Sequence, residues 1–316
     1  MIKNLRFLRW LMCLIVAFSC AACEKISNKA LKLKNKLNNT PTNTEYANLP
    51  TMVVGIETIL DVAYGAHPKQ KVDIYLPENA NNAPIIVMMH GGGWTSGDKR
   101  GLLAYVNKVN RWGPKGFIFV SVGTRLMPEA DVYTQLQDLT QAVVSIQKHA
   151  SEWGGNPEKL ILMGHSSGGT LVATLSAKPS LVTDLGGKRW LGTILLDASS
   201  LDIERTMRLW SHGMFTYAYG KDTKKWSIAS PYALIDTHAI PFFIACSTFR
   251  PDNACEQAEL FKEKASQLNI RVDISRQKLN HGEINDHLGL NNDFTQSIEA
   301  FMRSLDANVA QLLQAD

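Results

Sequence analysis

The chain has 316 residues, of which 45% are hydrophobic and 20% are charged. This length and composition allow a large buried core and exclude a disordered, collagen-like or coiled-coil protein. The net charge is +4, but residues 1–40 hold eight Lys or Arg and one Glu, so the rest of the chain carries −3. A mildly acidic body lacks the basic surface that nucleic acids bind, and we therefore expect no nucleic-acid partner.

The first residues have the features of an export signal. Lys3, Arg6 and Arg9 precede the apolar run 11–18, which is too short to span a bilayer comfortably. Small residues and cysteines follow this run. We therefore interpret residues 1–22 as a signal peptide and expect an exported protein.

Two cysteines near the end of this signal are candidates for a lipid anchor. Ser19-Cys20 and Ala22-Cys23 resemble the lipobox of bacterial lipoproteins, in which the cysteine is diacylated and becomes the mature N-terminus. Neither is a full match, because the bulky Phe18 precedes the first pair and the second has no Leu. We favour Cys23 over Cys20 and expect membrane attachment in the cell envelope, with the rest of the chain in the periplasm or outside. An ordinary cleaved signal peptide and an uncleaved anchor helix are the alternatives.

The remaining chain divides into a tether and one domain. Residues 23–51 are rich in Lys, Asn and Thr and have little apolar surface, which predicts a basic polar tether. In residues 52–316, short apolar runs alternate with helical periodicity, which is typical of an α/β domain. The strands we predict are 72–76, 85–89, 117–122, 160–163, 194–196, 242–245 and 272–274, the first of them at an edge of the sheet.

The pattern predicts a mostly parallel central sheet with helices on both faces. The clearest helix is predicted over 134–152, where Leu136, Leu139, Val143 and Ile146 form one apolar stripe. Crossovers between parallel strands are right-handed, so successive helices cover both faces. Sites in such sheets form at the carboxyl ends of the strands, and the residues that follow each strand are therefore the candidates for chemistry.

Gly164-His165-Ser166-Ser167-Gly168 follows the predicted strand 160–163 and precedes an apolar helical run. This is G-x-S-x-G between a strand and a helix, where a sharp turn exposes the serine hydroxyl and the glycines allow close approach of the backbone. The motif alone is weak, because a Gly/Ser-rich turn can match it. The strand before it and the helix after it favour Ser166 as a nucleophile.

His90-Gly91-Gly92-Gly93-Trp94 directly follows the predicted strand 85–89. Consecutive glycines allow backbone N–H groups to converge on one point, which is what an oxyanion hole requires. A flexible glycine loop is the alternative. Two such motifs at two strand ends, in this order, favour acyl-transfer chemistry.

These motifs resemble the α/β-hydrolase esterases of the hormone-sensitive-lipase and arylformamidase type. The resemblance covers roughly residues 58–305 and includes HGGGW, the stretch 124–129, GHSSGG and a downstream histidine. It departs from the family at Thr124, where Tyr is frequent, and at Ser167, where Ala is frequent. The resemblance implies that residues 52–316 are an α/β-hydrolase catalytic domain.

The family also implies the remaining site residues. Its histidine follows the last strand, which points to His281, with His287 as the alternative. Its acid follows the preceding strand, which points to Asp252, with Asp202 and Asp286 as rivals. The oxyanion donors would be the N–H groups of Gly92, Gly93 and Ser167, and Trp94 is a candidate for the substrate pocket. We expect His90 and His165 to hold loops by hydrogen bonds.

Cys246 and Cys255 lie close to the expected acid. An exported chain meets an oxidising compartment, so these two cysteines can form a disulfide, and two separate thiols are the alternative. They have no neighbouring ligands at zinc spacing, and we expect no metal. The sequence also has no phosphate loop or dinucleotide fingerprint, and the proposed chemistry needs no cofactor.

The sequence thus predicts a serine carboxylic-ester hydrolase whose partner is a small-molecule ester with a short acyl group. The alternatives are an arylformamidase that hydrolyses N-formylkynurenine, and an acetyl or feruloyl esterase that acts on polysaccharide. A binding protein on a hydrolase fold would be expected to lack one of the site residues. The segment 198–240 either covers the acyl pocket or belongs to the core. Its bulky side chains are Met207, Trp210, Met214, Phe215 and Tyr219.

Overall fold

An eight-stranded sheet forms the centre of the part of the chain that this computed structural model describes, residues 55–210 and 213–314. The expected signal peptide, the tether and both candidate lipidation sites, Cys20 and Cys23, lie outside the described residues. The strands are β1 (Ile56–Ala63), β2 (Lys71–Pro77), β3 (Ala83–Met89), β4 (Ile118–Val122), β5 (Gly155–His165), β6 (Gly192–Leu196), β7 (Phe242–Ser247) and β8 (Val272–Gln277). Their order in the sheet is β1-β2-β4-β3-β5-β6-β7-β8.

The sheet is mostly parallel, as predicted. From β4 through β8 all neighbouring strands are parallel, whereas β1 pairs antiparallel with β2 and β2 antiparallel with β4. Strands β3, β4 and β6 are buried at every position, which explains their unbroken apolar sequences. The prediction of an edge strand at 72–76 is wrong, because β1 covers that side of β2. We did not predict β1, whose side chains are largely exposed and whose apolar pattern is weak.

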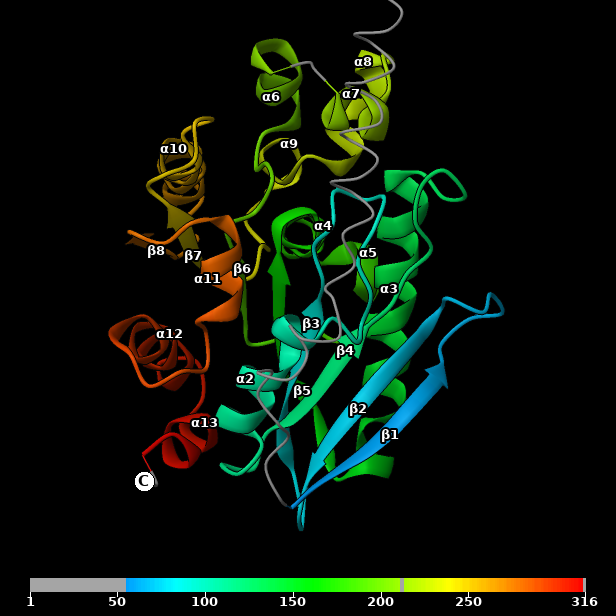
Figure 1. The fold of residues 1–316 in the computed structure, drawn as a ribbon, viewed down its shortest axis with the longest axis vertical. Coiled ribbons are helices and arrows are strands. Elements are labelled where there is room, and N and C mark those ends of the chain that lie inside the picture. Colours follow the sequence, from blue (N-terminus) through cyan, green and yellow to red (C-terminus); the bar gives the residue numbers. More distant parts are fainter. Residues whose placement is uncertain (1–54, 211–212, 315–316) are drawn as a thin grey trace, which may run out of the picture. The chain divides into compact units, whose positions relative to one another are not determined.

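Helices cover both faces of the sheet (Figure 1). They are α2 (Leu102–Trp112), α3 (Val132–His149), α4 (Ser166–Ala177), α5 (Ser180–Thr183), α6 (Ile203–Leu209), α7 (Met214–Tyr219), α8 (Thr223–Trp226), α9 (Pro231–Leu234), α10 (Ala254–Gln267), α11 (His281–Asp286), α12 (Asp293–Arg303) and α13 (Ala307–Leu312). Short 3₁₀ segments span Ala150–Trp153 and Ser227–Ala229.

The alternation of side chains along the strands creates two apolar cores. In β3, Ile85 and Val87 face the core that α3, α4 and α10 cover, whereas Ile86 and Met88 face the core that α2, α12 and α13 cover. All four side chains are buried. The sheet is therefore held from both sides, and its strand ends are rigid supports for the loops between them.

Helix α3 agrees closely with the helix predicted over 134–152. The Asp131 side chain caps its start by accepting a hydrogen bond from the Thr134 N–H at 2.8 Å. The predicted apolar stripe is buried against the sheet. The helix ends at His149, and the 3₁₀ turn Ala150–Trp153 completes the predicted range.

A buried lysine joins α2 to α11. The Lys108 Nζ donates to the backbone oxygen of Asn285 at 2.7 Å and to its side-chain oxygen at 3.1 Å. Burial lowers the pKa of Lys108 to about 7. The contact satisfies one backbone carbonyl near the carboxyl end of α11 and so fixes a short helix that packing alone would hold weakly.

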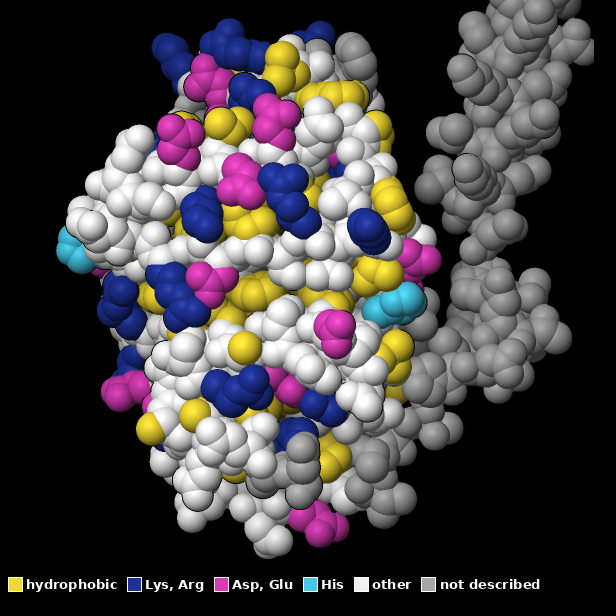
Figure 2. All heavy atoms as spheres, turned by 90° about the vertical axis from the view of Figure 1, so that its left-hand side faces the viewer, with side chains coloured by type: hydrophobic (Ala, Val, Ile, Leu, Met, Phe, Trp, Pro, Cys, Tyr) yellow, Lys and Arg dark blue, Asp and Glu magenta, His cyan; other side chains and the backbone are white. Residues whose placement is uncertain are grey.

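The surface over α10, α12 and β8 carries both signs of charge. Figure 2 shows Lys and Arg side chains interspersed with Asp and Glu on this face. Two of the ion pairs in this region are Arg271 with Asp273 and Arg276 with Glu259. Among the described residues, no helix has both the length and the apolar character of a membrane span.

The packing of β5 generates a stability prediction. Leu162 lies in the middle of this strand and is fully buried, so Leu162→Ala leaves a cavity and is expected to lower the free energy of unfolding by about 2–5 kcal/mol. Leu185→Ala is the matched control, because Leu185 is 60% exposed. Urea unfolding measures both, and equal midpoints for the two variants would contradict the described core.

Candidate active site

The turn between β5 and α4 presents Ser166 at the carboxyl end of the sheet. Ser166 has φ of +54°, a left-handed conformation that is unusual for a residue with a side chain. A Cβ atom on Gly168 would lie 2.2 Å from the backbone oxygen of His90, so only glycine fits where the helix meets the β3 loop. The strand, the sharp turn and the helix are all present as the G-x-S-x-G motif predicted.

His281 lies beside this serine. It is the first residue of α11, whose start is fixed by a capping box in which Asn280 accepts from the N–H groups of Gly282 and Glu283 and the Glu283 carboxylate accepts from the Asn280 N–H. The His281 Nε2 atom is 2.8 Å from the Ser166 Oγ atom. The structure thus brings together the predicted nucleophile and the predicted base.

The carboxylate on the other side of the imidazole belongs to Asp197, the residue that follows β6. Its Oδ2 atom is 2.6 Å from His281 Nδ1, and its Oδ1 atom accepts the Ser247 N–H at 2.9 Å. The side chain is fully buried. Burial alone would raise the pKa of Asp197, but the hydrogen bond from His281, the Arg250 charge and the Ser247 N–H hold the pKa below its usual value.

The prediction that Asp252 is the partner of His281 is therefore wrong. The Asp252 carboxylate contacts the guanidinium group of Arg250, which donates from Nε at 2.9 Å and also from Nη2. The loop after β7 thus places an arginine next to Asp197 and holds Asp252 on the far side of that arginine.

The two rival carboxylates and the alternative histidine also lie elsewhere. Asp202 caps the start of α6 by accepting from the Arg205 N–H at 3.1 Å. Asp286 ends α11, where its Oδ1 atom accepts from Asn285 at 3.3 Å. His287 is the C-cap of the same helix. The sequence prediction missed Asp197 because it placed the acid in the loop after the strand 242–245 and considered only Asp202 after the strand 194–196.

Ser199, which we also did not predict, contacts the nucleophile. Its Oγ atom is 3.2 Å from Ser166 Oγ, and its backbone N–H donates to the Ser166 carbonyl at 2.9 Å. The loop after β6 therefore contributes both a carboxylate to His281 and a hydroxyl to Ser166. No signal in the sequence distinguishes this serine from its neighbour Ser200.

The glycine loop after β3 lies against Ser166. A Cβ atom on Gly91 would be 2.9 Å from the Ser166 Cβ atom. Within the described part of the chain, no backbone acceptor takes the N–H of Gly92 or Gly93. The Ser167 N–H lies in the first turn of α4, where N–H groups have no partner within the helix. The oxyanion role of these three N–H groups stays a prediction.

Trp94 supports the glycine loop from inside the protein. Its ring is 1% exposed and packs edge-on against Phe215 and Tyr219, with ring centroids 5.8 Å and 5.2 Å away. Its indole N–H has no hydrogen-bond partner among the described residues. This position places Trp94 in the core, so its predicted place in the substrate pocket gains no support from the structure.

The bulky side chains of the segment 198–240 divide between core and surface. Met207 and Tyr219 are buried, whereas Trp210 and Met214 are more than 40% exposed. Met214 lies against the glycine loop, because a Cβ atom on Gly93 would be 2.5 Å from its sulfur.

Two other histidines hold the loops of the site, as predicted. The His165 Nε2 atom is 2.9 Å from the His281 backbone oxygen, and the two rings lie 4.7 Å apart. Burial, reinforced by the nearby His281, lowers the pKa of His165 to about 3. The His90 Nδ1 atom is 2.7 Å from the Gly91 carbonyl, and burial lowers the pKa of His90.

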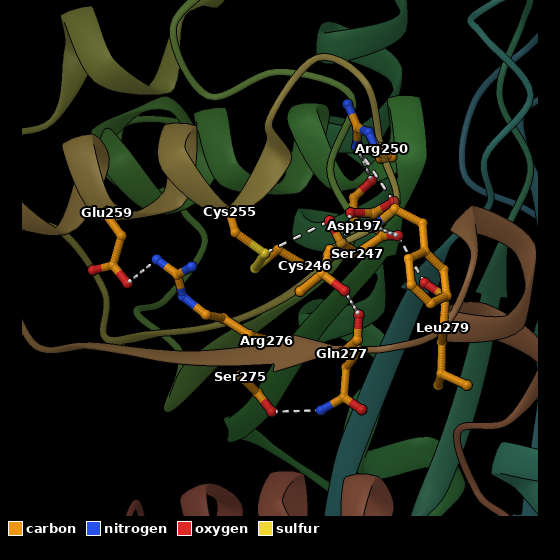
Figure 3. The surroundings of a disulfide bond; sticks show 12 residues. Asp197, Cys246, Ser247, Arg250, Cys255, Glu259, Ser275, Arg276, Gln277 and Leu279 are labelled. Atoms are coloured by element: carbon orange, nitrogen blue, oxygen red, sulfur yellow. Dashed lines mark hydrogen bonds and ion pairs between the residues drawn. A yellow bond between two sulfur atoms is a disulfide. The ribbon is translucent and has the colours of Figure 1, made fainter.

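A disulfide bond joins Cys246 in β7 to Cys255 in α10, with their Cα atoms 5.2 Å apart (Figure 3). Of the two alternatives that the sequence left open, the structure has the bridged form. The bond closes the loop that carries Arg250 and Asp252. Among the described residues, no group of three or more His, Cys, Asp or Glu side chains is arranged to hold a metal ion.

The sequence is similar to a family of known proteins and to individual hydrolases. Residues 72–188 match the family model described as BD-FAE. A kynurenine formamidase of Danio rerio is 35% identical over 120 residues, 37% of this chain and 38% of that relative. Carboxylesterase NlhH of Mycobacterium tuberculosis is 27% identical over 193 residues, 58% of this chain and 55% of that relative. The matched segments therefore span 38% and 55% of these two relatives.

Among solved structures, esterase B from Lactobacillus rhamnosis is similar with a TM-score of 0.68 and 18% identity, covering 93% of this chain and 96% of that protein. Thermogutta terrifontis esterase 2 is similar with a TM-score of 0.65 and 20% identity, covering 81% and 96%. The chain therefore has the α/β-hydrolase fold of these esterases, and its residues 72–188 are similar to the BD-FAE family.

Proposed function

We propose that the protein is a serine hydrolase that cleaves small or short-acyl carboxylic esters through an acyl-enzyme. The observation that carries this proposal is one imidazole between a hydroxyl and a carboxylate. His281 lies 2.8 Å from Ser166 Oγ through Nε2 and 2.6 Å from Asp197 Oδ2 through Nδ1. In this arrangement a general base can activate a serine nucleophile.

The reaction begins when Ser166 Oγ attacks the ester carbonyl carbon and His281 Nε2 accepts the hydroxyl proton. The carbonyl oxygen becomes an oxyanion, which the N–H groups of Gly92, Gly93 and Ser167 stabilise by hydrogen bonds. The bond to the alcohol then breaks, and His281 returns the proton to the departing oxygen. His281 next takes a proton from water as the water oxygen attacks the acyl carbon. The bond from that carbon to Ser166 Oγ then breaks, His281 returns the proton to Ser166 Oγ, and the acid is released.

Asp197 keeps His281 in the productive form. A carboxylate that accepts a hydrogen bond from Nδ1–H leaves Nε2 free to act as the base. It also stabilises the imidazolium ion that forms in each half of the reaction. The lowered pKa of Asp197 supports this role, because the carboxylate stays ionised at neutral pH.

The chemistry of the site supports esters first and formamides second. Met214 lies against Gly93 of the glycine loop, and an apolar side chain at this loop suits a small acyl group. The relative named kynurenine formamidase, which is 35% identical over 120 residues, favours an aryl formamide as the second candidate. Hydrolysis of a formamide follows the same steps, with an amine as the leaving group.

A panel of substrates tests the activity. We expect p-nitrophenyl acetate and butyrate to be hydrolysed faster than the palmitate, with kcat and KM measured for each together with N-formylkynurenine and an acetylated xylan. Ser166→Ala is expected to lose activity by a factor of about 10⁴ or more, since it removes the nucleophile. Preference for N-formylkynurenine would favour the second candidate, and an active Ser166→Ala variant would contradict the proposed nucleophile.

Substitution of the acid tests the assignment of Asp197. Asp197→Asn presents His281 with an amide that favours the wrong tautomer and does not stabilise imidazolium, so kcat is expected to fall by up to about 10⁴ at neutral pH. Asp202→Asn is the control, because Asp202 only caps α6. A larger loss in Asp252→Asn than in Asp197→Asn would restore the prediction made from the sequence.

We also propose that the protein is exported and held at the membrane of the cell envelope by a lipid on Cys23 or Cys20. The basic residues, the apolar run and the lipobox-like cysteines at the start of the chain support export. The disulfide between Cys246 and Cys255 fits this proposal, because such bonds persist in oxidising compartments.

Metabolic labelling tests the anchor. In cells fed with an alkyne fatty acid, the wild-type protein should acquire the label and fractionate with membranes, because diacylation attaches fatty-acyl chains to the modified cysteine. Cys23→Ala should abolish labelling and Cys20→Ala should keep it. Label that persists in the double variant, or a wild-type protein without label, would contradict the lipid anchor.

A further inference from the structure

The Arg250 side chain reaches from the loop after β7 into the loop that carries Asp197 (Figure 3). Its Nη1 donates to the backbone oxygens of Asp197 at 3.1 Å and Ala198 at 2.8 Å, and its Nη2 donates to that of Ser199 at 3.1 Å. The side chain is 12% exposed. A single guanidinium group thus binds three consecutive carbonyls of the segment 197–199.

This segment needs external support. Asp197 has φ of +49°, and the segment 197–199 belongs to no helix or strand that would pair its carbonyls. Yet the same segment carries the Asp197 carboxylate at His281 and the Ser199 hydroxyl at Ser166. The planar fork of an arginine can satisfy several fixed acceptors at once, which a lysine ammonium does less well.

The guanidinium also places a positive charge next to the acid. Its Nη1 atom lies 3.4 Å from Asp197 Oδ2, the same oxygen that contacts His281. On its other side it pairs with the Asp252 carboxylate through Nε and Nη2. One cation is therefore shared between two carboxylates, of which only Asp197 contacts the imidazole.

We propose that Arg250 is a positioning residue of the proposed hydrolase: it holds the segment 197–199 against Ser166 and His281, and its charge, partly balanced by Asp252, makes protonation of the resting imidazole less favourable. The proposal rests on the proposed function. It implies that the loop after β7 contributes a cation to the site instead of the acid that we predicted there.

Other charged groups near the Asp197–His281 pair are common to every variant considered below. His165 packs on His281 from the β5–α4 turn and stays neutral near pH 7, because its pKa is lowered to about 3. The charge of Lys108 on α2 helps to lower the pKa of His165. A difference in pH profile between variants of the loop after β7 is therefore caused by the change at Arg250 or Asp252.

The test uses two substitutions with opposite expected effects. Arg250→Gln removes the cation that disfavours protonation of the imidazole. The acidic limb of the pH profile, where the rate falls because His281 becomes protonated, should therefore move to higher pH. Asp252→Asn leaves the guanidinium charge unbalanced, so the limb should move to lower pH. Each shift is expected to be of the order of half to one pH unit. A purely structural role would not produce shifts of opposite sign.

The rate at neutral pH tests the holding role. Arg250→Gln should lower the rate about 10- to 100-fold, as expected for a displaced catalytic group. Arg250→Lys keeps the charge without the fork, so its limb should stay near that of the wild type while its rate falls. Arg271→Gln is the matched control, because Arg271 is an exposed arginine that pairs with Asp273 at the start of β8, at the opposite end of the strands from the site.

The readout is the pH dependence of two rates in the full-length protein: kcat/KM for p-nitrophenyl acetate, and the rate at which a p-nitrophenyl alkylphosphonate modifies Ser166. In the second reaction Ser166 Oγ bonds to phosphorus, p-nitrophenolate leaves and His281 takes the serine proton. This reaction needs no ester hydrolysis. A wild type that reacts with the phosphonate but hydrolyses no ester would defeat the proposed function alone.

The electrostatic part of the inference would be overturned if the acidic limbs of the pH profiles coincide in the wild type, Arg250→Gln and Asp252→Asn. The positioning part would be overturned if Arg250→Gln reacts with the phosphonate at the rate of the wild type. Circular dichroism and thermal unfolding confirm that each variant is folded. If Arg250→Gln does not fold, the comparison of Arg250→Lys with Asp252→Asn still decides, because only the proposal predicts an unshifted limb in one and a lowered limb in the other. A wild type that resists the phosphonate would overturn both proposals.

Discussion

The hydrogen-bond register of the parallel strands determines where every group of the site lies. Strand β5 pairs with β6 so that His165 is opposite Leu196, and the next residues, Ser166 and Asp197, therefore leave the sheet side by side. On its other side β5 pairs with β3, which brings Gly91 against the same serine. A shift of one residue in either pairing would separate these groups, even if the loops kept their conformations. The site thus depends on strands that are buried on both faces and have no freedom to slip.

Much of this arrangement could be predicted from the sequence, because its signals are local. A buried strand, a sharp turn with glycines and an apolar helix occur in sequence around Ser166, and glycines directly follow another buried strand. His281 could be predicted because it follows the last strand and begins a capped helix. Strand β1 could not, because a largely exposed edge strand has little apolar alternation.

The acid could not be predicted because its identity depends on contacts between different strands. Both Asp197 and Asp252 follow parallel strands at the same edge of the sheet, and the sequence does not say which carboxylate reaches the imidazole. In the structure Arg250 binds the Asp252 carboxylate, and its remaining N–H groups donate to backbone oxygens of the segment after β6. Asp197 was also difficult to predict because it directly follows a buried apolar strand, and a carboxylate in that position marks the end of the strand without indicating a functional role.

The buried Lys108 makes the stability of the folded protein depend on pH. Its pKa falls from an ordinary 10.5 to about 7 in the folded protein, so between these pH values the unfolded chain binds more protons than the folded one. Unfolding then takes up a proton, and the contribution of this lysine to stability rises with pH across that interval. Below about pH 7 both states are protonated, and the folded state bears the full cost of a buried ammonium group. The destabilisation that comes from burying Lys108 is therefore largest below about pH 7 and disappears towards pH 10.5.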